Sequence, residues 1–106
     1  MCGQNFDLVI RNGTVIDGTG AAGRAGDVGV TGDRITAVGD LHAARGRIEI
    51  DAAGNVVSPG FIDVHTHDDN ALLVKPDVAC KTSQGVTTVV VGNCGISLAP
   101  LAFRGG

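Results

Sequence analysis

The sequence predicts an α/β chain with a β-rich N-terminal part, and three observations lead to this class. Short β-branched runs alternate with Gly, Asn and Asp up to residue 58, and a Pro-Gly pair at 59–60 marks a change of pattern. Beyond that pair, two apolar runs flank a segment with loosely helical spacing. Strand, helix, strand is the order of a βαβ unit, which implies a parallel sheet. We therefore expect two segments, 1–58 and 59–106.

Hairpins are expected in the first segment. Asn12-Gly13 lies between β-branched runs at 6–10 and 14–16, and both residues tolerate positive φ. A second hairpin is expected at Gly32-Asp33, between the runs 27–31 and 34–38. Alternation over 47–51 predicts a half-buried strand, and a further strand is expected at 56–57. The segment thus resembles a small antiparallel sheet or half-sandwich.

The second segment is expected to form the βαβ unit. Residues 61–64 form an apolar run that only Asp63 interrupts, and 86–91 is β-branched throughout, as in a strand buried on both faces. The spacing over 69–83 predicts a helix that Pro76 breaks or restarts, with Asp68 or Asp69 as its N-cap.

Composition and charge limit the class of function. The 106 residues are 43% hydrophobic and 18% charged, with a formal net charge of −3. This excludes a disordered chain and gives no basic surface for nucleic acid or an anionic membrane. There is no apolar run of transmembrane length and no pattern of a secretory signal. Three scattered cysteines do not make a disulfide framework, so a cytoplasmic, reducing environment is expected.

Two histidines follow the first strand of the second segment. Side chains two apart on a strand share a face, with Cα atoms about 6–7 Å apart, so His65 and His67 can converge on one metal or straddle two. A pair of solvent-facing histidines without a ligand is the alternative. Asp63 lies two residues before His65. It is a candidate to orient a metal-binding histidine by accepting a hydrogen bond from it. Hydrogen bonding at the strand end is an equal alternative.

Cys94 follows the second strand and is the third candidate ligand. It comes after Gly92-Asn93 and before Gly95, one βα step from the histidines. Thiolate and imidazole together favour Zn²⁺, and zinc with an open position lowers the pKa of a bound water to about 7, which suits hydrolysis. An inert, small hydrophobic cysteine is the alternative.

The remaining candidate residues are expected to be structural. Asn93 and Ser97 are expected to support the cysteine loop, and Cys80 is expected to be buried in the helix. His42 is expected to be solvated between strands, and Cys2 to lie in a frayed terminus.

These motifs resemble a known family. Pro-Gly-Phe-Ile-Asp-Val-His-Thr-His at 59–67 is similar to the first barrel strand of the amidohydrolase superfamily, and 7–18 resembles the β-sandwich strands that precede that barrel. His-Thr-His-Asp-Asp-Asn at 65–70, with 83–88 and Gly-Asn-Cys-Gly-Ile-Ser at 92–97, is similar to the N-acyl-D-amino-acid deacylases, or D-aminoacylases. The resemblance covers essentially the whole chain.

The resemblance implies a zinc-dependent hydrolase that cleaves N-acyl-D-amino acids to a carboxylate and a free D-amino acid. It implies a composite β-sandwich and a metal-dependent (β/α)8 barrel, with His65, His67 and Cys94 as metal ligands. The family's further ligands, its general-base aspartate and its substrate contacts are expected downstream. A (β/α)8 barrel needs about 250 residues, so the chain is expected to be an N-terminal fragment that is inactive alone.

Two alternatives remain open. A cyclic amidase, such as a hydantoinase or dihydroorotase, shares the His-x-His motif, but a cysteine after the second strand is not expected there. A downstream lysine that can be carboxylated would favour this alternative. The other is a non-catalytic scaffold on the same fold. Retention of His65, His67 and Cys94 counts against a scaffold.

Overall fold

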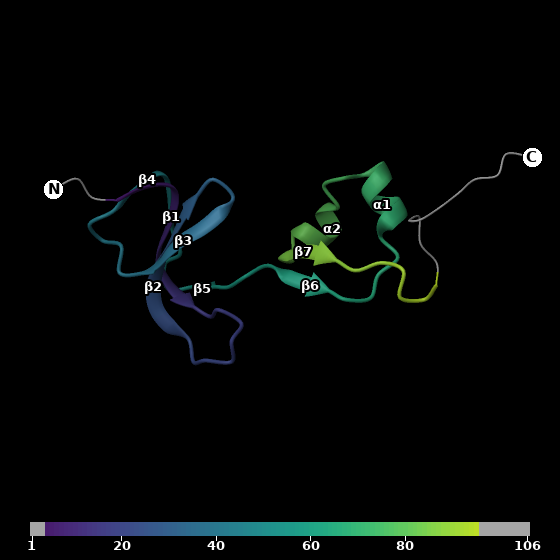
Figure 1. Cartoon of the computed structure of the whole chain (residues 1–106), viewed down its shortest axis with the longest axis horizontal. Helices are drawn as coiled ribbons and strands as arrows, with labels where there is room; N and C mark the ends of the chain where they lie inside the picture. Colours follow the sequence, from purple (N-terminus) through teal and green to yellow (C-terminus); the bar gives the residue numbers. More distant parts are fainter. Residues whose placement is uncertain (1–3, 96–106) are drawn as a thin grey trace, which may run out of the picture. The chain divides into compact units, whose positions relative to one another are not determined.

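The structure is a computed structural model that describes residues 4–95. The chain divides into two compact units, Met1–Pro59 and Gly60–Gly106, each of which is described by itself (Figure 1). No helix in the described range has the length and apolar character needed to cross a membrane.

The first unit is a mixed five-stranded sheet in the order β3-β2-β1-β4, with β5 also paired to β1. Its strands are β1 Asn5–Val15, β2 Arg24–Thr31, β3 Arg34–Gly39, β4 Arg45–Asp51 and β5 Val56–Val57. β1 pairs antiparallel with β2 but parallel with β4 and β5, so a purely antiparallel sheet was a wrong expectation. The reason is that the chain crosses from β3 to the other side of β1 before it forms β4.

The hairpin expected at Asn12-Gly13 is wrong. β1 continues through both residues, and its register with β2 shifts between Ile10 and Gly13. Asn12 has a φ of 58°, which suits a β-bulge as well as a turn. Its backbone N–H donates to Asp27 Oδ1 (2.9 Å) and its side chain donates to Asp51 Oδ1 (3.2 Å). Partners from β2 and β4 therefore hold Asn12 inside the sheet.

The second expected hairpin of the first unit is confirmed. β2 and β3 form an antiparallel hairpin around Gly32, whose φ is 59°. A strand also forms over 47–51, as part of β4, but its expected half-burial is wrong, because β4 lies at the edge of the sheet with Ile48 51% and Ile50 49% exposed. Phe6, Val9 and Ala44 form one buried cluster, against which Ala37 and Leu41 pack, and Val15 and Val28 are buried as well.

The second unit has the expected βαβ order. β6 (Phe61–Asp63) and β7 (Val86–Val89) pair in parallel, and α1 (Asp69–Val74) and α2 (Ala79–Thr82) lie between them in sequence. Pro76 lies between the two helices, where it was expected to interrupt the helical segment. Asp68 is the N-cap of α1, but its side chain makes no capping hydrogen bond.

Burial in the second unit differs from the expectation. β7 was expected to be buried on both faces, yet its two valines are half-exposed and its two threonines exposed, and Phe61 and Ile62 of β6 are each 61% exposed. Cys80 is also exposed, so its expected burial is wrong. A parallel strand is buried only where a layer covers each of its faces. In the described part of the chain, the four-residue helix α2 packs on β7, and it is too short to provide such a layer.

Candidate metal centre

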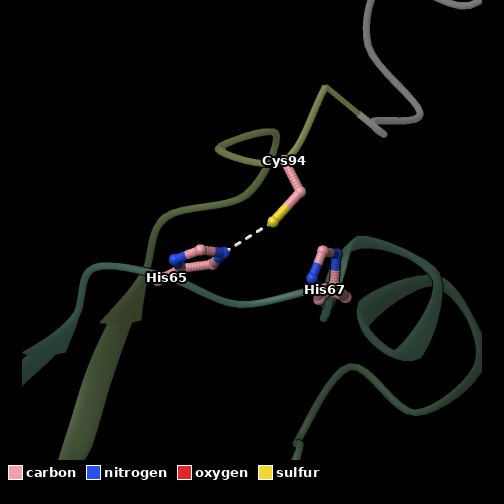
Figure 2. A group of neighbouring side chains, drawn as sticks. All are labelled: His65, His67 and Cys94. Carbon is pink, nitrogen blue, oxygen red and sulfur yellow. Dashed lines mark hydrogen bonds between the residues drawn. The ribbon is translucent and has the colours of Figure 1, made fainter.

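His65 and His67 lie just beyond the end of β6, with both rings on the side from which Cys94 approaches (Figure 2). The ring centroids are 5.9 Å apart, with an angle of 62° between the ring planes. Thr66 is 5% exposed, whereas both histidines are exposed. The alternation expected of a strand therefore continues past the end of β6, because Thr66 faces the interior and its neighbours do not.

Cys94 completes the cluster from the loop after β7 (Figure 2). Its Sγ lies 2.8 Å from His65 Nε2, and the ligand atoms of all three residues lie within 4.8 Å of one another. Gly92 and Gly95 flank this position with φ of 85° and 77°. Such left-handed conformations favour glycine, so these two residues allow the tight turn that brings the thiol back over the histidines.

Hydrogen bonds join the histidine segment to the chain after β7. The Val90 N–H donates to the Asp63 carbonyl (2.8 Å), and the Thr66 N–H donates to the Val90 carbonyl (3.0 Å). The Thr66 hydroxyl donates to the same Val90 carbonyl (3.2 Å), and the Asn93 side-chain amide donates to the Val64 carbonyl. These bonds fix the spacing between the imidazoles and the thiol. Ser97, which was also expected to support the cysteine loop, lies outside the described residues.

The three donors fit a zinc ion. Zinc prefers histidine nitrogen and cysteine sulfur, at about 2.0–2.1 and 2.3 Å, so tetrahedral ligand atoms lie about 3.4–3.6 Å apart. The distance between His65 Nε2 and Cys94 Sγ, 2.8 Å, is shorter than this separation, and the upper limit for the three ligand atoms, 4.8 Å, is longer. Small side-chain rotations would therefore place the three atoms around one ion. If all three bound one zinc ion, a fourth position would stay open, which is the arrangement of catalytic zinc sites.

Asp63 contacts the backbone beside the histidines. Its Oδ1 accepts a long hydrogen bond from the His65 N–H (3.4 Å), and its Oδ2 accepts one from Lys81 Nζ (2.6 Å). These contacts match hydrogen bonding at the strand end, which was one of the two alternatives for this residue. The Lys81 ammonium beside Asp63 holds the pKa of that carboxyl below its usual value.

Lys81 is a residue that sequence reasoning misses. It comes from α2, and its ammonium also lies 3.2 Å from Asp68 Oδ2. The available signal was a lysine in the helical segment that follows the acidic residues Asp63, Asp68 and Asp69, but lysines and carboxylates at such distances are common on solvated helices. The other expected structural residues lie elsewhere: His42 is exposed in the first unit and contacts Asp40 (2.8 Å), and Cys2 lies outside the described residues.

The chain belongs to the amidohydrolase family, whose model matches residues 49–104. This range includes both histidines and the cysteine of the cluster.

Within that family, the resemblance to D-aminoacylases is confirmed. The chain is 62% identical over 99 residues to the D-aminoacylase of Alcaligenes xylosoxydans xylosoxydans, a match that covers 93% of this chain and 20% of that protein. A solved D-aminoacylase structure that addresses its binuclear metal centre has 69% identity and a TM-score of 0.86, covering 92% of this chain and 21% of the other. The N-acyl-D-glutamate deacylase of Bordetella bronchiseptica, complexed with zinc and a phosphonate inhibitor, has 56% identity and a TM-score of 0.86, covering 92% and 20%. The chain thus spans about a fifth of the length of these relatives.

Proposed function

We propose that this chain is part of a zinc-dependent amidohydrolase that converts N-acyl-D-amino acids to a carboxylate and a free D-amino acid. The observation that carries the proposal is the convergence of His65, His67 and Cys94 in a chain that is 62% identical to a D-aminoacylase. In this proposal the first unit contributes to a β-sandwich, and the second begins a (β/α)8 barrel. Barrel enzymes carry their chemistry at the C-terminal ends of the strands, and all three residues follow such ends.

The proposed mechanism assigns metal binding to these three residues. His65 and His67 offer imidazole nitrogen and Cys94 offers thiolate, the strongest single zinc donor of the set. A zinc ion held there supplies Lewis acidity, which polarises the amide carbonyl and lowers the pKa of water. All three side chains are exposed, so a substrate can approach them. Thr66 and Asn93 hold the backbone of the ligand segments in place, and a carboxylate from outside this chain transfers the proton to the leaving amine.

One observation favours the deacylase over a cyclic amidase. The Cys94 thiol lies within the donor set, 2.8 Å from His65 Nε2, where a cyclic amidase is not expected to have a cysteine. The convergence of three donors also counts against a scaffold without a ligand.

The test compares two cysteines in the intact protein. Cys94→Ala should lower zinc affinity on the order of 100-fold, because structural zinc sites bind with roughly 10–16 kcal/mol shared among four ligands. It should also abolish release of amino acid from N-acetyl-D-amino acids. Cys80→Ala is the matched control, since Cys80 is exposed and is not one of the three converging residues. Equal zinc content and turnover in wild type and Cys94→Ala would overturn the proposal.

A further inference from the structure

We propose that Lys81 is a positioning residue of the metal centre, because its ammonium links two carboxylates that flank the histidine segment on either side. Asp63 comes two residues before His65, and Asp68 comes directly after His67. The inference rests on the proposed function, since it takes the two histidines as metal ligands.

The geometry of Lys81 brings three elements together. Its Nζ lies 2.6 Å from Asp63 Oδ2 and 3.2 Å from Asp68 Oδ2. Asp63 is the last residue of β6, Asp68 is the N-cap of α1, and Lys81 itself is in α2. One side chain therefore joins the strand before the histidines to the helix after them.

Burial makes this contact more than a surface ion pair. The side chains of Lys81, Asp63 and Asp68 are 28%, 35% and 21% exposed. The Oδ2 atom of Asp68 is itself buried and has no well-aligned hydrogen bond, so its contact with Lys81 is an ion pair. The carboxylates of Asp63 and, to a smaller extent, Asp68 raise the pKa of Lys81, which keeps the ammonium charged. Removing the cation would leave a partly buried carboxylate without compensation, which is costly.

The linkage reaches the ligands through the backbone. Asp63 accepts the His65 N–H with the carboxylate oxygen that Lys81 does not use (3.4 Å). Asp68 accepts the Leu72 N–H with its main-chain carbonyl (2.8 Å), which starts α1. Lys81 thus restrains both ends of the segment, while Thr66 attaches its middle to the chain after β7. Without Lys81, the middle stays attached but the two ends that orient the histidines are released.

A merely structural role for Lys81 makes a different prediction. In that case Lys81 would stabilise the packing of α2, and its loss would lower the melting temperature without changing the metal ligands. A positioning role requires a change in metal affinity and in the geometry of the bound ion. These two readouts separate the roles.

The experiment uses Lys81→Met, Lys81→Arg and the control Lys75→Met in the intact protein. Zn²⁺ alone is titrated against a chelator, the absorption spectrum is recorded with Co²⁺ in place of zinc, and the melting temperature of the metal-free protein is measured. Lys81→Met should weaken zinc binding by about 10–100-fold and alter the cobalt spectrum, as is typical when a residue that supports metal ligands is lost. Lys81→Arg keeps the charge and should restore affinity to within a few-fold. Lys75 is an exposed lysine at the end of α1, and its variant should match wild type.

Each outcome has a defined meaning. A lower melting temperature with wild-type zinc affinity and an unchanged cobalt spectrum in Lys81→Met would overturn the inference. If Lys81→Met does not fold, Asp68→Asn replaces it, because it removes one ion pair and leaves the Asp63 contact in place; wild-type affinity there would also overturn the inference. Cys94→Ala separates the two proposals. Wild-type zinc affinity in Cys94→Ala contradicts the proposed function. Weak zinc binding in Cys94→Ala together with wild-type zinc affinity in Lys81→Met contradicts only the positioning role of Lys81.

Discussion

Gly60→Ala should separate the two strands that carry the candidate metal site. A Cβ at position 60 would lie 2.1 Å from Thr87 Oγ1, 2.3 Å from its Cγ2 and 2.7 Å from its Cβ. Gly60 directly precedes β6 and Thr87 is in β7, so the clash falls between paired strands. Rotation about χ1 of Thr87 turns at most one of the first two atoms away, because both are attached to Cβ, and it does not move Cβ itself, which the backbone fixes. The strands must therefore move apart until the Cβ–Cβ distance exceeds about 3.0 Å.

The expected magnitude is the difference between two effects. Overpacking of this kind costs about 1–3 kcal/mol. The φ of Gly60 is one that alanine adopts without strain, so the substitution also gains about 0.4–1 kcal/mol by restricting the unfolded chain. The net destabilisation is about 1–2 kcal/mol. Because β6 leads directly into His65, its displacement should also weaken zinc binding.

Hydrogen–deuterium exchange of the β6 and β7 amides in the intact protein measures this local opening. Gly26→Ala is the control, because a Cβ there meets its nearest atom at 3.6 Å and the backbone conformation is ordinary. Adding Thr87→Ala to Gly60→Ala should restore part of the protection, since it removes the two closest atoms. The reasoning would be refuted if Gly60→Ala and Gly26→Ala showed the same protection of the β6 and β7 amides from exchange and the same zinc affinity.

Three further predictions concern other residues. Thr66→Val removes the hydrogen bond from the Thr66 hydroxyl to Val90 but keeps the backbone hydrogen bond and the side-chain shape. The free energy of unfolding, measured by denaturant titration, should therefore fall by about 1 kcal/mol, while zinc affinity stays nearly unchanged. A large loss of zinc affinity would contradict this prediction. Hydrogen bonds from Thr19 lower the pKa of Asp17 from 3.8 to about 2. The ionised Asp17 carboxylate therefore stabilises the folded protein fully above pH 3.8, and this contribution is lost as the pH falls through 2. In the Asp17→Asn variant, the melting temperature should therefore depend less on pH between pH 2 and 3.8. A pH profile of the melting temperature parallel to that of wild type would count against this role of Asp17. The 106-residue chain alone should bind a hydrophobic dye and aggregate, because Leu73 and Val74 are 74% and 70% exposed, and sedimentation as a dye-free monomer would disprove this.

Several features of the fold are encoded within a few neighbouring residues. Gly32 allows a tight turn, so the β2–β3 hairpin follows from local conformational preference. Pro76 cannot continue a helix, which explains why α1 and α2 are separate. The same holds for the histidines, because a period of two places both rings opposite Thr66 whatever surrounds the strand.

Asn12 and Cys80 show why local reasoning fails elsewhere. Positive φ at Asn12 is compatible with a turn and with a bulge, and the choice depends on Asp27 and Asp51, which are 15 and 39 residues away in sequence. Burial of Cys80 and of β7 depends on which layers cover the strand pair, and no local pattern contains that information.

In the candidate site, too, some features follow from the local sequence and others only from the folded chain. The amino-acid sequence alone was enough to predict His65, His67 and Cys94 as one group, because strand periodicity and the common edge of parallel strands are general properties of the backbone. The link from Lys81 to Asp63 and Asp68 appears only in the folded chain. A lysine side chain is long and has many rotamers, so its partners are selected by the packing of α2 and not by any spacing along the sequence.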